Sequence, residues 1–306
     1  MLDVAAERLG ISPTAVEKDY WASEILHVLS REFESDFIFK GGTSLSKGYR
    51  LVERFSEDID ILVVPGKRGG SATDTLMKAM ANTAAIGVGG VAAGIDAERG
   101  RHRSYKITYP ATREPTALIP TSVLLEMGTR GGPHPHESVP ISSLLGDVLE
   151  AAGTDLDEFD DLKPFEVSVL HPGRTLLEKL VLIHTLTQQL TADTKRSIDR
   201  RTGRHFYDVY QLLGDRQVLD LLTDRDQTEQ VLHSIKEIDQ TYFKGGTDVR
   251  PAGGFATCPA FDSTSDISTQ FQEAYEATMP DLYFGTSPLP TWEEICDRVA
   301  QQQALL

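Results

Sequence analysis

Two stretches of the sequence decide the fold: FKGGTSLSK at residues 39–47 and RFSEDIDIL at residues 54–62. The first is typical of a short buried strand that ends at two glycines and turns into a helix led by Ser/Thr residues. Such a turn exposes free backbone N–H groups at a helix N-terminus, where phosphate binds, and Gly41 and Gly42 have no Cβ atoms to keep a phosphate away. Turns of this kind also occur in many connections that bind nothing.

The second stretch adds a pair of carboxylates. In a strand, residues i and i+2 lie on one face about 6.6–6.8 Å apart, so Asp58 and Asp60 lie side by side while Ile59 and Ile61 face the core. Adjacent carboxylates repel each other unless a cation lies between them, and oxygen-only ligands suit Mg²⁺ or Mn²⁺. A solvent-facing strand that happens to carry acidic residues is the alternative. Because the Gly-Gly turn precedes this strand, we favour a site in which two ions clamp a phosphoryl displacement.

Composition limits the class of protein. The 306 residues give room for two domains, and 30 basic against 46 acidic side chains give a net charge of −16. This charge argues against indiscriminate nucleic-acid binding, so an RNA partner requires a local basic patch. Two cysteines make neither a disulfide framework nor a zinc site. The start of the chain lacks a signal-peptide pattern, and the longest uncharged stretch, residues 79–95, is too short to span a membrane. We expect a cytoplasmic protein with no membrane partner.

The pattern of elements changes along the chain. Ser12 and Pro13 are typical of a helix N-terminus, residues 71–86 are helical in pattern, and residues 103–109 and 121–127 alternate as strands. We interpret residues 79–95 as the end of a helix followed by a Gly-rich loop. From about residue 172 the pattern is helical, and Thr291 and Glu294 form a capping box. The sequence therefore predicts an α+β protein, with a mixed sheet and helices in residues 1–168 and a helical domain in residues 169–306.

Four motifs in order resemble a known family. The GG-[ST] turn and the R-F-S-x-D-x-D strand are similar to those of the DNA polymerase β-like nucleotidyltransferase superfamily. Three further motifs resemble its AbiEii/AbiGii toxin branch, which includes the MenT-type toxins of type IV toxin–antitoxin systems: EKDYW at 17–21, LEKL at 177–180 and RHFYDVY at 204–210. In the last motif His205 replaces the usual first Asp. The resemblance covers roughly residues 15–215 and implies a polymerase β-like core followed by a helical domain.

The resemblance also implies a metal-dependent reaction. Asp58 and Asp60 would hold Mg²⁺, or Mn²⁺, at the phosphates of an NTP substrate. A third carboxylate on a neighbouring strand would activate the incoming hydroxyl, and Glu126 on strand 121–127 is the candidate for this role and for a metal ligand. The alternative for Glu126 is a strand-end carboxylate with no role.

The same resemblance implies catalytic roles for two residues of the helical half. Lys179 would contact the triphosphate, whereas a lysine beside an apolar stripe is ordinarily a surface residue. Asp208 would orient Lys179 or contact the nucleotide; the alternative is a surface acid paired with Arg204. Lys47 could reach phosphate or could be solvated. The residues expected to bind the nucleotide are Gly41, Gly42, Thr43, Ser44, Lys47 and Ser56.

Two basic clusters suggest the acceptor. One is Lys195, Arg196, Arg200, Arg201 and Arg204; the other is Arg99, Arg101, Arg103 and Lys106. Either suits an RNA end, although a charge run is usually a solvated loop. We expect transfer of NMP to RNA, above all to the tRNA 3′ end, with Arg200, Arg201 and Arg204 binding RNA and a cognate antitoxin as partner. The alternatives are a protein or small-molecule acceptor, or a nucleotide-binding module controlled by a partner. The Gly/Pro-rich segment 244–265 could be a lid or a connector.

Overall fold

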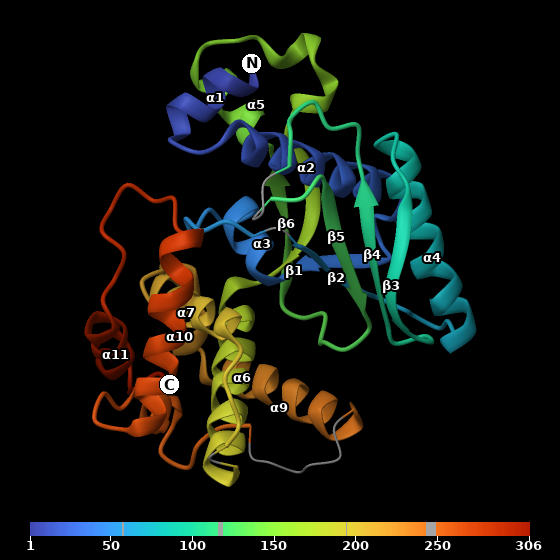
Figure 1. The fold of residues 1–306 in the computed structure, drawn as a ribbon. Helices are drawn as coiled ribbons and strands as arrows, with labels where there is room; N and C mark the ends of the chain where they lie inside the picture. The colour runs from blue at the N-terminus through green and yellow to red at the C-terminus, as the bar shows by residue number, and fades with distance from the viewer. Residues whose placement is uncertain (57, 116–118, 194, 243–248) are drawn as a thin grey trace. The chain divides into compact units, whose positions relative to one another are not determined.

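The computed structural model describes residues 1–56, 58–115, 119–193, 195–242 and 249–306 (Figure 1). Over these residues the chain forms a mixed seven-stranded sheet and eleven α-helices, which confirms the predicted α+β class. It divides into two compact units: Met1–Arg50 with Ser56–Leu170, which holds the sheet, and Leu51–Phe55 with His171–Leu306, which is helical. Glu57 and residues 244–248 of the Gly/Pro-rich segment lie outside the described residues.

The sheet has the order β3-β4-β5-β2-β1-β7-β6. The β1/β7 and β2/β5 pairs are parallel, and the other neighbours are antiparallel. The strands are β1 (Phe37–Lys40), β2 (Asp58–Val63), β3 (Ala92–Glu98), β4 (His102–Thr108), β5 (Ser122–Gly128), β6 (His136–Ile141) and β7 (Phe165–Leu170).

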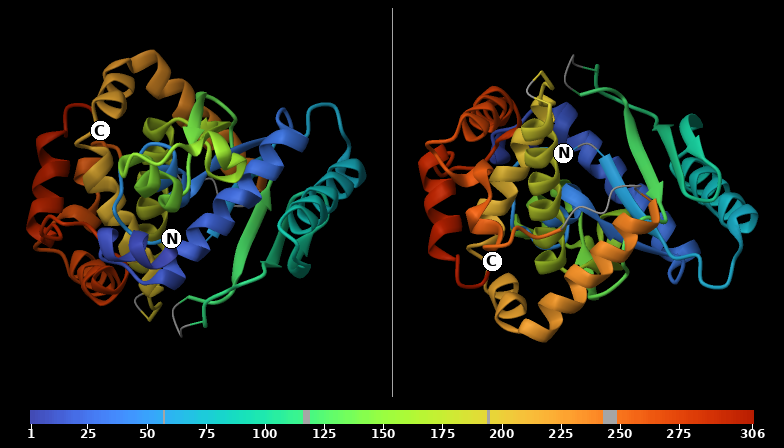
Figure 2. Two further views of the ribbon diagram at one scale, coloured as in Figure 1. Left: turned by 90° about the horizontal axis from the view of Figure 1, so that it is seen from above. Right: turned by 90° about the horizontal axis from the view of Figure 1, so that it is seen from below.

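One face of the sheet is covered by two helices, α2 (Pro13–Phe33) and α4 (Gly70–Gly87), and the two views of Figure 2 show α4 running alongside β3 and β4. Ile25 of α2, Met77 of α4 and Ile59 of β2 belong to this main core and are fully buried. Burial of such apolar surface is the main source of stability for this unit. Two further helices of the unit, α1 (Leu2–Leu9) and α5 (Leu144–Ala151), enclose a smaller apolar cluster with the start of α2.

Local signals explain most of these elements. Ser12 caps α2 by accepting a hydrogen bond from the Ala15 N–H, and Pro13 is the first helical residue, as predicted. The helix after the Gly-Gly turn, α3, spans Gly41–Lys47 and so includes both glycines. Arg50, three residues after its end, has φ of +55°. The predicted loop within 79–95 contains the start of β3, whose exposed faces give no apolar alternation to detect.

The second unit is built from six α-helices within its described residues: α6 (Pro172–Ala192), α7 (Gly203–Leu212), α8 (Arg216–Thr223), α9 (Arg225–Tyr242), α10 (Asp266–Leu282) and α11 (Trp292–Gln301). Its core centres on Phe206, whose ring centroid lies 5.0 Å from that of Phe271 and 4.8 Å from that of Trp292. The predicted capping box of Thr291 and Glu294 begins α11. None of the helices in the described part of either unit is long and apolar enough to cross a bilayer.

Candidate functional site

The predicted carboxylates share one face of the sheet. Asp60 on β2 is the register partner of Glu126 on the parallel strand β5, so their side chains lie on the same side; Asp58, two residues earlier, faces the same way. All three are partly exposed, whereas Ile59 and Ile61 between them are buried in the main core. The strand pattern thus produces the predicted acidic face, which we define as Asp58, Asp60 and Glu126.

Strand register adds two residues that sequence reasoning missed. Lys40 on β1 is the partner of Asp60, and Ser104 on β4 is the partner of Glu126, so one row runs across four strands from Lys40 to Ser104. Lys40 directly precedes the Gly-Gly turn, and this position could have marked it as a candidate site residue. Ser104 is buried, with 4% of its surface exposed, and it can be assigned to this row only once the strand order is known.

The glycine turn lies directly against the acidic face. Gly41 has φ of +80°, and a Cβ at this position would lie 2.0 Å from Oδ2 of Asp60, so only glycine fits beside that carboxylate. Thr43 Oγ1 lies 2.8 Å from Ser56 Oγ and donates to the Asp58 carbonyl. Ser44 Oγ donates to the Gly41 carbonyl at 2.8 Å. The turn and the start of β2 are therefore fixed to each other, with Thr43 beside Ser56.

Lys47 has a different environment from the solvated one considered above. Its Nζ lies 2.5 Å from Oδ1 of Asp19 and donates to Ser23 Oγ at 2.8 Å, and its side chain is only 7% exposed. Oδ2 of Asp19 in turn accepts from the Leu144 N–H. Lys47 thus fastens α3 to α2 and α5, and a role in phosphate binding stays a prediction.

The EKDYW motif has a structural explanation. Glu17 accepts hydrogen bonds from the Thr112 N–H at 2.7 Å and the Arg113 N–H at 3.1 Å, and Trp21 stacks on Tyr109. These contacts, with those of Asp19, attach α2 to the connections that follow β4 and β6.

A buried ion cluster lies in the helical unit. Asp208 on α7 is completely buried, and its two oxygens accept from Arg54 Nε at 2.6 Å and Nη2 at 2.8 Å. Lys179 on α6, 8% exposed, places Nζ 2.7 Å from Oδ2 of the same carboxylate. Lys179 is therefore not a surface lysine, and Asp208 is not a surface acid paired with Arg204. We call Arg54, Lys179 and Asp208 the ion cluster.

The charges of the ion cluster follow from its contacts. Burial by itself raises the pKa of Asp208, but the Arg54 and Lys179 cations hold that pKa below its usual range, so the carboxylate is ionised. Burial lowers the pKa of Lys179, which the Asp208 carboxylate opposes.

His205, whose Nδ1 lies 3.4 Å from Lys179 Nζ, has its pKa held well below the usual value by burial and by the Lys179 charge. It is therefore neutral at pH 7 and adds no negative charge where the usual motif has an aspartate.

Arg54 is the residue of this cluster that the sequence did not assign. It lies in the segment Leu51–Phe55, which is fixed to the helical unit on both sides of the arginine. The Phe55 N–H donates to the Leu282 carbonyl at 2.8 Å, and the Glu53 N–H donates to Tyr207 Oη at 3.1 Å. No local pattern around position 54 indicates a buried ion pair with a residue 154 positions later.

The two basic clusters differ in how far they are neutralised. Lys195, Arg196, Arg200 and Arg201 are exposed, and Arg204 is half-buried at the start of α7. In the other cluster Arg103 donates to both oxygens of Asp74, at 2.7 and 3.0 Å, and Arg101 pairs with Glu98. In the first cluster Arg201 lies 4.0 Å from Asp199, so fewer of its members are held by an acidic side chain in a described contact.

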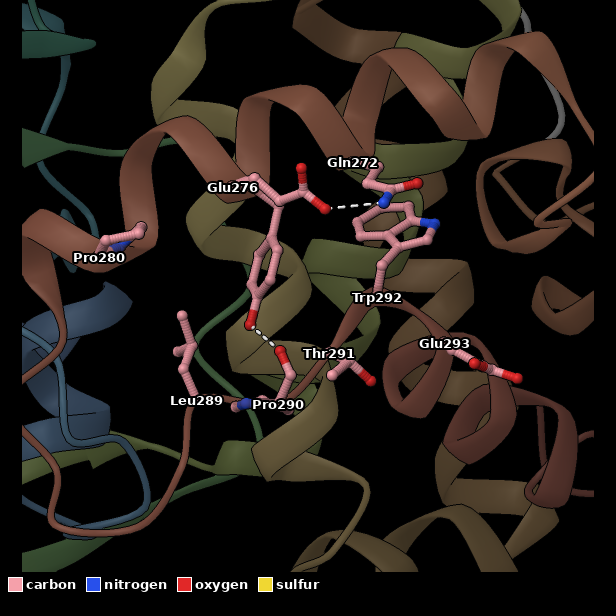
Figure 3. A pocket seen from close by; sticks show the side chains of 9 residues that line it. Gln272, Glu276, Pro280, Leu289, Pro290, Thr291, Trp292 and Glu293 are labelled. Carbon is pink, nitrogen blue, oxygen red and sulfur yellow. Dashed lines mark hydrogen bonds between the residues drawn. The ribbon is translucent and has the colours of Figure 1, made fainter.

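The remaining candidate features offer fewer reactive side chains. A groove of about 420 Å³ lies beside α10 and the start of α11. Figure 3 shows side chains that line it, and none of the predicted site residues is among them. Its Tyr275 hydroxyl is already bonded to the Pro290 carbonyl at 2.5 Å. Cys258 is buried, and its thiol pKa is raised by burial, as expected for a cysteine that is not a nucleophile. His136 begins β6 and so belongs to the sheet.

The acidic face has the chemistry of a hard-cation site. Its donors are carboxylate oxygens only, and the Asp60 carboxylate packs directly against Gly41 of the turn. Among the residues that the structure describes, no group of three or more His, Cys, Asp or Glu side chains is gathered closely enough to enclose a metal. Mg²⁺ is usually bound by one or two carboxylates and completed by water and substrate phosphates.

Comparison with known proteins identifies the family. A family model described as nucleotidyl transferase AbiEii toxin, type IV toxin–antitoxin system, matches residues 27–298. The chain belongs to the AbiEii family. A similar solved structure is MenT4, a nucleotidyltransferase toxin from Mycobacterium tuberculosis H37Rv, with a TM-score of 0.54 and 16% identity over 100% of this chain and 89% of that one. A search of curated proteins found no match. The predicted AbiEii resemblance and nucleotidyltransferase fold are confirmed, and this AbiEii protein is a toxin-type nucleotidyltransferase.

Proposed function

We propose that this AbiEii protein transfers NMP from an NTP to an RNA hydroxyl, above all at the 3′ end of tRNA, in a reaction that depends on Mg²⁺ or Mn²⁺. The modified tRNA could not be aminoacylated, so translation would stop, and a cognate antitoxin would restrain the enzyme in the cytoplasm. The observation that carries the proposal is the contact of the glycine turn with Asp60, which brings a phosphate-binding turn to a pair of carboxylates.

On the sheet unit, the acidic face and the turn have separate tasks. Asp58 and Asp60 would hold the metal, which when bound neutralises phosphate charge and orients the groups for in-line displacement. Glu126, in register with Asp60, would accept the proton of the attacking hydroxyl. The residues that would hold the phosphates are Gly41, Gly42, Thr43, Ser44 and Ser56.

The reaction is a simple displacement at phosphorus. The oxygen of the acceptor hydroxyl forms a bond to the α-phosphorus of the NTP, the bond from that phosphorus to the bridging α–β oxygen breaks, and pyrophosphate leaves with that electron pair. Charge therefore accumulates on the leaving pyrophosphate, and a fixed cation lowers the barrier there. Lys179 would supply this cation, and Asp208 would orient it through their 2.7 Å contact.

The proposed RNA contacts belong to the helical unit, as Lys179 and Asp208 do. Arg204 lies one turn before Asp208 on α7, and its charge also lowers the pKa of Lys179. Arg200, Arg201 and Arg204 would therefore contact the acceptor RNA near Lys179.

The experiment is radiolabel transfer. Purified protein is incubated with Mg²⁺, total tRNA and each α-³²P-NTP in turn, beside Asp58→Ala. Label on tRNA with one or two of the nucleotides, absent in the variant, is the expected result. Label on protein would retain the transferase and remove RNA as acceptor. Absence of label from every acceptor, with each nucleotide, would contradict the proposal.

A further inference from the structure

Lys40 occupies an unusual position for a lysine. It is the last residue of β1, which lies between β2 and β7 in the sheet, and the other three residues of this strand are buried. The Lys40 side chain is partly exposed and lies on the same side of the sheet as the acidic face, because Lys40 is the register partner of Asp60. Lysine is depleted in strands, so strand formation by itself does not explain this residue.

Local structure assigns Lys40 no stabilising role. It is the N-cap residue of α3, but a lysine has no side-chain acceptor for a free backbone N–H, and its side chain makes no capping hydrogen bond. Within the described residues, its ammonium group forms no ion pair, with Asp60 or with any other acid. Lys47, seven residues later, shows the contrast, since its Nζ is held by Asp19 at 2.5 Å. The charge of Lys40 is therefore not used to hold the sheet unit together.

The row across the sheet places Lys40 and Glu126 on opposite sides of Asp60. Asp60 pairs with Lys40 of β1 on one side and with Glu126 of β5 on the other. Neighbouring strands are about 4.8 Å apart, so the backbones at Lys40 and Glu126 are roughly 10 Å apart with Asp60 between them. In-line displacement requires the attacking and leaving oxygens on opposite sides of the phosphorus. A base and a cation on opposite sides of a metal-binding carboxylate match this requirement.

From this arrangement we propose that Lys40 binds the phosphates that leave as pyrophosphate, and that the acceptor hydroxyl approaches from the β5 side of the row. The inference rests on the proposed function and deepens it, because it assigns the leaving group and the acceptor to the two sides of Asp60. In the displacement described above, Lys40 keeps its proton and stabilises the charge that develops on the pyrophosphate.

The chemistry of the lysine and of its neighbour agrees with this role. An ammonium group is a compact charge with three donors, and lysine is a common ligand of phosphate in proteins. Gly41 directly follows Lys40 and packs against Oδ2 of Asp60. A phosphate at this point would therefore contact the backbone of the turn and the Lys40 side chain together.

The test compares variants of the full chain by calorimetry with inorganic tripolyphosphate in Mg²⁺ buffer and by steady-state kinetics with NTP and tRNA. Lys40→Gln removes the charge and should weaken tripolyphosphate binding and raise KM for NTP by about 10-fold or more, because a charge-assisted contact is lost. KM for tRNA should stay within about 3-fold of the parent value, since the acceptor lies on the other side of Asp60. The matched control is Lys67→Gln, which removes an exposed lysine of the same unit and should leave all three values unchanged.

Three outcomes would overturn the inference. They are an unchanged affinity of Lys40→Gln for tripolyphosphate, a larger effect on KM for tRNA than on KM for NTP, and a clear decrease in the urea midpoint of unfolding, which would indicate a structural lysine. If Lys40→Gln does not fold, Lys40→Arg keeps the charge and should bind tripolyphosphate within about 3-fold of the parent; a loss of about 10-fold or more would contradict the inference. If the parent binds neither tripolyphosphate nor any NTP, the proposed function itself fails and the inference fails with it.

Discussion

The acidic face and the ion cluster differ in how their charged side chains are arranged and buried. The acidic face places Asp58, Asp60 and Glu126 on one side of a sheet, partly exposed to solvent and with like charges together. The ion cluster places Asp208 out of contact with solvent, between the cations of Arg54 and Lys179. One region gathers carboxylates on one face, whereas the other pairs a single carboxylate with two cations.

This difference shows under which conditions the folded protein tolerates each arrangement of carboxylates. Partly exposed carboxylates lose little hydration, so neighbouring strands can carry them side by side. A completely buried carboxylate is tolerated only when its oxygens are paired, because the desolvation of an unpaired ion costs several kcal/mol. We therefore expect substitutions in the acidic face to affect activity and substitutions in the ion cluster to affect both activity and stability.

The largest effect is expected for Asp60→Ala. Loss of a carboxylate from the acidic face should reduce transfer by about 10³-fold or more, because metal neutralisation of phosphate charge is lost. The folded state should be retained, since the side chain lies outside the main core. Transfer assays and circular dichroism check both statements, with Asp96→Ala, a 75% exposed carboxylate of β3, as control. Undiminished transfer by Asp60→Ala would remove the metal assignment.

In contrast to Asp60→Ala, Asp208→Ala should lower the free energy of unfolding. It leaves Arg54 and Lys179 buried together without an anion, and loss of one partner from a buried pair costs about 3–5 kcal/mol. Urea denaturation measures this, with Asp220→Ala as control. The Asp220 carboxylate is 72% exposed, and its removal should change the free energy of unfolding by less than about 0.5 kcal/mol. Similar losses for the two variants would contradict the contrast drawn above.

A moderate effect is expected at the exposed basic cluster. Arg200→Gln/Arg201→Gln should raise KM for tRNA by about 10-fold and lower the salt slope of binding by about 2, because two phosphate contacts are lost. KM for NTP should change little, since both side chains are exposed and outside the ion cluster. Steady-state kinetics at several salt concentrations measure all three values, with Arg216→Gln as control. An unaltered salt slope would move the RNA contact to another surface.

The smallest effect is a pH dependence of stability. The pKa of Asp208 is lowered by its cations, so its contribution is present above the usual pKa of about 3.9 and is lost as pH falls towards the folded-state pKa. Below about pH 5, the free energy of unfolding of the parent should therefore fall more steeply than that of Asp208→Asn, by up to about 1.4 kcal/mol per pH unit. Urea denaturation at successive pH values tests this, and parallel curves would contradict it.

The sequence predicted what a single segment encodes. Alternation of Asp and Ile over residues 58–63 defines both faces of β2, and Ser12 and Thr291 mark helix starts by local capping chemistry. The motif order also identified the AbiEii family, which the family comparison confirmed. These features depend on neighbours within a few residues.

The rest depends on contacts between distant segments. The sequence contained Arg54, Lys179 and Asp208, but nothing near Arg54 indicates that its guanidinium meets a carboxylate on α7. Likewise, the row from Lys40 to Ser104 exists only because β5 lies between β2 and β4. Such juxtapositions are set by strand order and helix packing, which alternation and capping patterns do not determine.

The most direct measurement of the central claim is the state of tRNA 3′ ends in cells. Total RNA is sequenced from the 3′ end after brief expression of the parent chain and of Asp60→Ala. We predict one or more added nucleotides on tRNA, together with growth arrest, for the parent, and neither for the variant. Growth arrest by the parent with unmodified tRNA ends would contradict the claim that tRNA is the acceptor.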